Sequence, residues 1–329
     1  MVRLVPIALV TVLVVGGGVA VAGGKAVRIE KPQPREVAIP AGTFKMGLTE
    51  EQTTSALDQC QLAYFGKEIR QAQTAQGQFT DFCTEYHADL THMQQRDVFL
   101  DAYAIDRDEV SVADYRRCVD SGKCELDALV AGDERYIHSD WPMVNATWEE
   151  AQTFCRAQGK RLPTEAEWER AAVGDVANAD WPWGELEQPK DFNHGQPRAI
   201  TMRVIERQLS VIPIKFFGDP DDSDGFALMA PPGSFPWGES PFGTRDQAGN
   251  VAEWTADAYF KDDLKKGYTG LPAANPFRDG SAQSRVIRGG SWRQPTFVAK
   301  SNLRDPFNPY YDASARFSHV GFRCARSNR

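Results

Sequence analysis

The sequence is poor in the residues that hold most transition metals in proteins. It has only five histidines, and its six cysteines form neither a C-x-x-C pair nor part of a His-rich cluster. Zinc sites depend on such closely spaced thiolates and imidazoles, so a zinc protein is a weak interpretation. Basic residues are outnumbered as well, and the net charge of −8 at pH 7 argues against a nucleic-acid-binding protein. No internal repeat is evident along the chain.

The N-terminus carries one basic residue, Arg3, and then an apolar run from Leu4 to Ala22. This pattern is typical of a secretory signal or a membrane anchor. The run ends in an A-x-A-like cleavage site, yet it is nearly long enough to span a bilayer. No cysteine follows it, which excludes lipid attachment at that point. We therefore predict a signal peptide at 1–24, or a membrane anchor formed by residues 4–22, and a polar linker at 25–36. The protein would be exported, either periplasmic or associated with the cell envelope.

Loop-forming residues are abundant, because the chain has 27 Gly and 20 Pro. Roughly 300 residues follow the apolar run, enough for one large domain or two ordinary ones. A loop-rich chain needs covalent or metal staples, and an even number of cysteines behind an export signal favours disulfides, although six cysteines allow many pairings. The cysteines are Cys60, Cys83, Cys118, Cys124, Cys155 and Cys324.

Charge is unevenly distributed along the sequence. From Arg285 to the end, nine basic residues stand against two acidic ones, so this segment carries +7 and the remainder −15. One interpretation is that the basic segment packs against acidic parts of the same fold. The other is a pocket for an anionic group, since guanidinium groups bind carboxylates and phosphates well. We favour internal pairing.

Hydrophobic periodicity and helix-capping patterns predict a mixture of strands and helices. Thr147 with Glu150, and Thr164 with Glu167, each form a capping box, in which the two side chains satisfy backbone N–H groups at a helix start. Beyond Trp181, frequent Gly, Pro and Asp-Gly steps predict irregular structure. The expected elements are a strand pair within 37–47, helices at 50–72 and 78–92, a strand at 98–105, and helices starting at Ser111, at Thr147 (to Gly159) and within 165–172.

A series of short motifs occurs in one fixed order along most of the chain. Each motif is short, but their common order is highly specific. Together they resemble the formylglycine-generating enzyme (sulfatase-modifying factor) family over residues 37–326. The motifs are Ile39–Gly47, Ile105–Ser111, Pro142–Trp148, Gly159–Glu169, Trp183–Glu185, Asp246–Trp254, Arg288–Trp292 and Gly321–Cys324.

The resemblance implies a single large α+β domain at 37–329. Its fold would be the formylglycine-generating-enzyme fold, a loop-rich variant of the C-type-lectin-like fold. Two insertions depart from the family's pattern: residues 48–97 add a cysteine-bearing helical pair, and residues 196–222 enlarge a loop. The family also places a disulfide at Cys155–Cys324. Cys118–Cys124 and Cys60–Cys83 then follow by elimination and proximity.

Structural calcium is also implied by the resemblance. Calcium takes carboxylate and carbonyl oxygens from flexible loops. On the residues alone, capping of turns is the alternative role for these acids. The first site would use the side chains of Asp246 and Glu253 and the carbonyls of Gly249 and Val251. The second would use Asn193, the carbonyl of His194, Asp224 and the carbonyl of Phe226.

In the family's enzymes, two cysteines five residues apart follow a Gly-Gly-Ser-aromatic motif. They bind copper and oxidise a substrate cysteine to formylglycine. Here Gly289-Gly290-Ser291-Trp292 is followed by Gln294 and Ala299 at those positions. Neither residue can hold Cu(I), which selects soft thiolate ligands. We therefore expect neither copper nor the family's activity.

Two functions remain open. The first is a non-catalytic envelope protein that binds a peptide, a glycan or a partner protein. The second is an oxidoreductase of the same superfamily with altered chemistry on a small-molecule or protein substrate, which a bound redox metal would indicate. The candidate residues lining an inherited cleft, whose alternative role is core and ion-pair support, are Trp292, Arg293, Gln294, Arg304 and Arg316.

Overall fold

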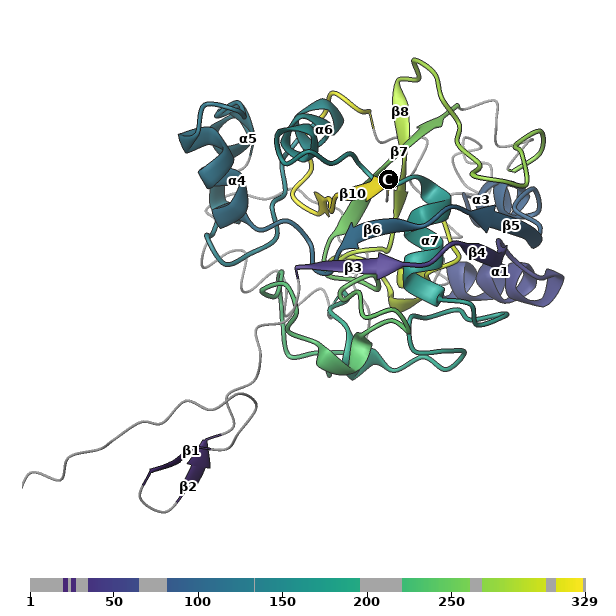
Figure 1. The fold of residues 1–329 in the computed structure, drawn as a ribbon. Coiled ribbons are helices and arrows are strands. Elements are labelled where there is room, and N and C mark those ends of the chain that lie inside the picture. Colours follow the sequence, from purple (N-terminus) through teal and green to yellow (C-terminus); the bar gives the residue numbers. More distant parts are fainter. Residues whose placement is uncertain are drawn as a thin grey trace, which may run out of the picture. The chain divides into compact units, whose positions relative to one another are not determined.

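The computed structural model describes residues 20–22, 25–27, 35–64, 82–132, 134–195, 221–260, 268–305 and 312–327 (Figure 1). The chain divides into two units, Met1–Pro34 and Arg35–Arg329. In the first unit, β1 (Ala20–Ala22) pairs antiparallel with β2 (Lys25–Val27). Most of the predicted signal or anchor lies outside the described residues. Within the described residues, no helix is long and apolar enough to cross a membrane.

Two small antiparallel sheets open the second unit. β6 (Tyr103–Asp106) is the central strand of a three-stranded sheet, between β3 (Glu36–Ile39) and β10 (Ala325–Ser327). β4 (Gly42–Met46) pairs with β5 (Arg96–Leu100). The first and last strands of the unit are therefore neighbours of the same strand (Figure 1).

The two strands predicted within 37–47 are confirmed as β3 and β4, although they pair with β6 and β5 and not with each other, but the single strand at 98–105 is wrong. The chain forms β5 and β6 in different sheets, and the break falls at Asp101. There, the backbone N–H of Asp101 donates to Asn275 Oδ1 at 2.9 Å instead of to a neighbouring strand. A hydrophobic pattern cannot distinguish one long strand from two short ones that change sheets.

The described residues of the insertion include two helices, α1 (Glu50–Tyr64) and α3 (Phe82–Leu90), linked by the Cys60–Cys83 disulfide. Cys60, Cys83 and Leu90 are fully buried in the same core as residues of β4 and β5. The insertion is thus part of the main core. The predicted extensions of these helices, to 72 and from 78, lie outside the described residues.

Capping residues set the starts of the central helices. Ser111 accepts from Asp114 N at the start of α4 (Val112–Asp120), which is followed by the short α5 (Asp127–Val130) and a 3-10 turn at Glu134–Tyr136. Both predicted capping boxes are present, at the starts of α6 (Trp148–Ala157) and α7 (Glu165–Val173). Each box satisfies two N–H groups that have no partner within the helix.

The C-terminal half contains a second three-stranded sheet. β7 (Ala252–Tyr259) lies between β8 (Ser284–Arg288), which is antiparallel to it, and β9 (Val320–Gly321), which is parallel. The prediction of irregular structure beyond Trp181 missed this sheet. Seven of the eight residues of β7 are buried, so the strand lacks the alternation that identifies a half-buried strand. The remaining elements are 3-10 turns: η2 (Pro189–Asp191), η3 (Pro236–Gly238) and η5 (Thr296–Ala299).

All three expected disulfides are present: Cys60–Cys83, Cys118–Cys124 and Cys155–Cys324. Among the described residues no cysteine is free. The third disulfide joins α6 to the segment just before β10, across 169 residues of sequence. The cysteines therefore act as structural staples.

Candidate functional site

The side chain of Gln294 is the middle member of a hydrogen-bonded series that runs from Ser291 to Asp305. Ser291 Oγ donates to Gln294 Oε1 at 2.8 Å, and Gln294 Nε2 donates to Asp305 Oδ2 at 2.8 Å. All three side chains are buried. Buried polar groups are stable only when they are paired in this way. The amide is thus a structural link between two loops, with no group capable of redox chemistry.

Ala299 ends η5 and packs in a small apolar cluster with Trp181, Phe192 and Ala248. The backbone of Gly290 runs directly against it: a Cβ on Gly290 would lie 2.8 Å from Ala299 N, and φ at Gly290 is +65°. Only glycine fits there without displacement of η5. The described neighbours of Ala299 are therefore backbone atoms and apolar side chains, none of which is a thiolate ligand for a soft metal.

The five residues predicted to line a cleft occupy different environments. Trp292 is buried, and its indole N–H donates to Ser318 O at 3.3 Å. Arg293 lies 3.2 Å from His319 Nδ1. Burial, and then Arg293, lower the pKa of His319 well below its ordinary value, so this imidazole is neutral. Arg316 forms a two-point ion pair with Glu150, at 2.5 and 2.7 Å. Trp292 thus packs in the core and Arg316 forms an ion pair, which are the contacts expected from the alternative, supporting role of these residues.

Arg304 belongs to a buried ionic network with Arg288. Both of its bonds, at 2.7 Å, go to Glu165. Arg288 donates to Glu165 Oε1 at 2.8 Å and to Glu169 Oε2 at 2.6 Å. Burial alone would raise the pKa of Glu165, but the two guanidinium groups hold it below its ordinary value. The basic C-terminal segment thus neutralises acids of α7, as the internal-pairing interpretation predicted.

The first predicted calcium set is largely occupied by protein contacts. Glu253 Oε1 accepts from Arg323 at 2.6 Å, and Oε2 accepts from Arg323 at 2.7 Å and from Trp168 at 2.8 Å. Asp246 Oδ2 accepts from Gly233 N at 2.5 Å, and burial raises the pKa of Asp246 to about 6. Because a guanidinium group already neutralises Glu253, this set of donors fits a divalent cation poorly.

Sequence reasoning did not single out Glu109, yet it organises this loop. Its Oε1 accepts from Val251 N at 3.1 Å and its Oε2 accepts from Asn250 Nδ2 at 2.6 Å. Burial, followed by the charges of Asp246 and Glu253, raises the pKa of Glu109 well above its ordinary value. The only signal was its place in the Ile105–Ser111 motif, since its partners lie more than a hundred residues away.

The second predicted calcium set fits a hard cation better. Asn193 Oδ1 is buried and has no hydrogen-bond partner among the described residues. Nearby, Asp224 accepts from His194 N at 3.0 Å and from Phe226 N at 3.2 Å, so the four predicted residues do come together. A buried unpaired amide oxygen beside a carboxylate has the oxygen chemistry that calcium requires. Since the set contains only two side-chain ligands, carbonyl groups would have to supply the rest.

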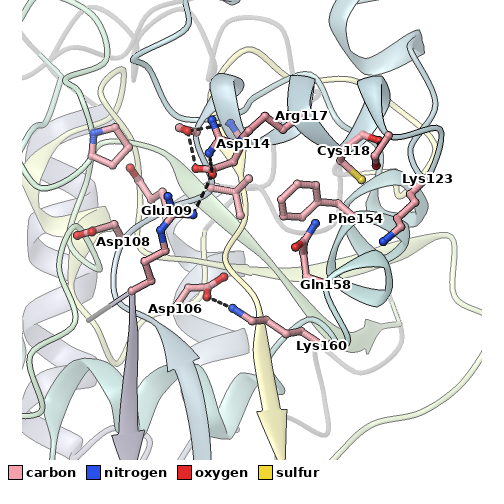
Figure 2. A pocket seen from close by; sticks show the side chains of 15 residues that line it. Asp106, Asp108, Glu109, Asp114, Arg117, Cys118, Lys123, Phe154, Gln158 and Lys160 are labelled. Carbon is pink, nitrogen blue, oxygen red and sulfur yellow. Dashed lines mark hydrogen bonds and ion pairs between the residues drawn. The ribbon is translucent and has the colours of Figure 1, made fainter. Parts of the chain in front are cut away.

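A separate pocket of about 450 Å³ borders α4. Figure 2 shows Lys160 directed at Asp106, to which it is bound at 2.5 Å, with Phe154 and Gln158 on the α6 side. Asp114 pairs with Arg117 on the same wall. Because its charges of opposite sign neutralise each other, the pocket presents no field that selects one class of ligand.

The sheets, the buried α7 network and the ordered motifs together define an α+β domain of the formylglycine-generating-enzyme type. The chain belongs to the sulfatase-modifying factor enzyme 1-like domain family, whose model matches residues 24–328.

Curated relatives include formylglycine-generating enzyme of Mus musculus, 33% identical over 197 residues, which covers 59% of this chain and 46% of the relative. Inactive C-alpha-formylglycine-generating enzyme 2 of Bos taurus is 30% identical over 187 residues, 56% of this chain and 50% of the relative. The chain thus spans about half the length of the curated relatives it matches. Among solved structures, PvdO from Pseudomonas aeruginosa has a TM-score of 0.59 at 22% identity, over 89% of this chain and 94% of that one, which shows a shared fold.

Proposed function

We propose that this chain is an exported, envelope-associated binding protein that uses the family's scaffold without copper-dependent oxidation. The observation that carries the proposal is the state of Gln294 and Ala299. The first is tied between Ser291 and Asp305, and the second is packed against aromatic rings. The ligand would be a peptide, a glycan or a partner protein of the envelope. Three disulfides support an oxidising location, where such bonds persist.

A structural calcium ion at Asn193, His194, Asp224 and Phe226 is part of the proposal. It would satisfy the unpaired Asn193 Oδ1 and brace the loop that ends at Phe226. Calcium contributes no electron transfer, so this role is consistent with a non-catalytic domain. The support for the second site is stronger than for the first, where Arg323 already holds Glu253.

The test is metal analysis of the full chain, purified without chelators, alongside an oxidation assay on a sulfatase-motif peptide. Mouse formylglycine-generating enzyme loaded with copper is the positive control. We expect calcium, no stoichiometric copper after incubation with Cu(I), and an unchanged peptide. One copper per chain with peptide oxidation would refute the proposal. A different bound redox metal with oxygen consumption would instead support the altered oxidoreductase.

A further inference from the structure

A groove of about 990 Å³ lies between the first turns of α1 and the segment 178–186. The insertion supplies one wall, and a segment outside the insertion supplies the other. Gln52 holds the two walls together, because its Nε2 donates to Asn178 O at 3.0 Å and to Asp180 Oδ1 at 2.8 Å. The groove therefore exists only because the helical pair is present and docked.

The groove is lined by carboxylates, and none of its described lining residues is basic. Glu50, Glu51 and Asp58 come from α1, and Asp180 and Glu185 come from the opposite wall. Asp180 pairs with Lys300 at 2.8 Å. The other four form no ion pair with any residue that the structure describes. A concave surface with charges of one sign concentrates ligands of the opposite sign.

Two segments on the Glu185 side of the groove each carry an exposed large apolar side chain. Leu186, at the edge of the groove, is 76% exposed, and Trp237 in η3 is 77% exposed. Trp183 connects their segments: its indole N–H donates to Leu186 O at 2.8 Å, and its ring is 3.6 Å from where a Cβ on Gly238 would lie. Single exposed apolar residues are ordinary, but Leu186 lines a groove, where an apolar side chain can form part of an interaction surface.

We propose that this groove is the site where the binding protein takes a basic peptide segment that carries an apolar side chain. The inference rests on the proposed function, to which it adds a place and a ligand chemistry. Lysine or arginine side chains would neutralise Glu50, Glu51, Asp58 and Glu185. The apolar side chain would cover Leu186 and Trp237. A neutral glycan would leave the acids uncompensated, and an anionic membrane would be repelled.

The inference can be tested with the full chain and a fluorescein-labelled peptide, three repeats of Lys-Leu-Lys-Gly, followed by anisotropy at low and high salt. Two variants target the groove: Glu50→Gln with Glu51→Gln, and Leu186→Ala with Trp237→Ala. The control, Glu125→Gln with Asp140→Asn, removes the same charge from exposed positions of another region. Circular dichroism and Tm check that each variant is folded, which is expected because all of these side chains point outward.

We expect the basic peptide to bind, with weaker binding at high salt. Each exposed ion pair is worth up to a factor of about five, so the charge variant should weaken binding by roughly 10-fold. The apolar variant should weaken it by about 10-fold or more, as for an interface anchor, and the control should match the wild type. Equal affinity in all four proteins would overturn the inference. So would binding of maltohexaose, or of the same peptide with Glu for Lys, in place of the basic peptide.

The groove substitutions leave Gln294 and Ala299 untouched. If peptide binding does not depend on the groove residues and the protein still binds no copper, only this inference is refuted. Copper-dependent oxidation would instead refute the proposed function.

Discussion

Replacing Arg288 with methionine should lower the free energy of unfolding by about 3–5 kcal/mol, the usual effect of removing one partner of a buried ion pair. Arg288 is fully buried and donates to Glu165, to Glu169 and, at 2.6 Å, to Ser301 O. Glu165 keeps both bonds to Arg304. Glu169 keeps two neutral donors, the backbone N–H of Gly47 at 2.7 Å and the hydroxyl of Tyr268 at 3.4 Å, but it loses its ion-pair partner, so its charge is left without a cation among the described residues.

The assay is urea denaturation followed by circular dichroism, with Lys45→Met as the matched control. Lys45 pairs with Asp97 at 2.9 Å on the surface, where both side chains are largely exposed, and its loss should cost at most about 1 kcal/mol. Adding Glu169→Gln to the Arg288→Met protein should recover part of the loss, because the amide removes the stranded charge. A loss below about 1 kcal/mol, or no recovery, would show that the network is not energetically coupled.

Three further outcomes are expected. Removing the Cys155–Cys324 disulfide, which closes a loop of 169 residues, should lower the free energy of unfolding by about 5 kcal/mol in the chain-entropy estimate. Removing Cys118–Cys124, which closes a loop of six, should lower it by about 2 kcal/mol. Equal losses in the two Cys→Ala double variants would contradict this order. Burial, and then the charge of Glu165, raise the pKa of Asp257 to about 7, so the folded protein binds this proton more tightly than the unfolded chain. The contribution of Asp257 to stability should therefore decline from about pH 4 to about pH 7. Over this range the free energy of unfolding of Asp257→Asn should change less with pH than that of the wild type, and two parallel pH profiles would contradict the prediction. Finally, calcium at about 100 times its Kd should raise Tm by about 4 °C, and neither chelation nor calcium should shift the Tm of Asp224→Asn; an unchanged wild-type Tm after chelation would rule out a bound structural ion.

Local patterns in the sequence predicted what depends on near neighbours. The capping boxes at Thr147 and Thr164 need only the residue three positions on, and both are present. The two strands at 37–47 were likewise predictable from adjacent residues, but their partners, β6 and β5, were not. The Cys155–Cys324 disulfide spans 169 residues, and there the family motifs supplied the information that spacing alone left open; the other two pairings then followed by elimination and proximity.

Contacts between distant segments were much less predictable. The basic C-terminal segment was expected to meet acids somewhere in the fold, but nothing in the sequence identified α7. Arg288 and Arg304 reach their glutamates across 119 to 139 residues. The calcium sets show the same limit. Family motifs located their residues, but only the structure shows Arg323 bound to Glu253 and Asn193 Oδ1 unpaired.

The placement of the last strands has a consequence for biosynthesis. β10 pairs with β6 beside β3, β9 pairs with β7, and Cys324 closes the longest disulfide. Both sheets can therefore be completed only after residues 320–327 have been synthesised, and each pairing joins segments that lie far apart in the sequence. Long-range pairing of this kind is slow to form. A nascent chain would therefore remain without its completed sheets until these late strands have been made.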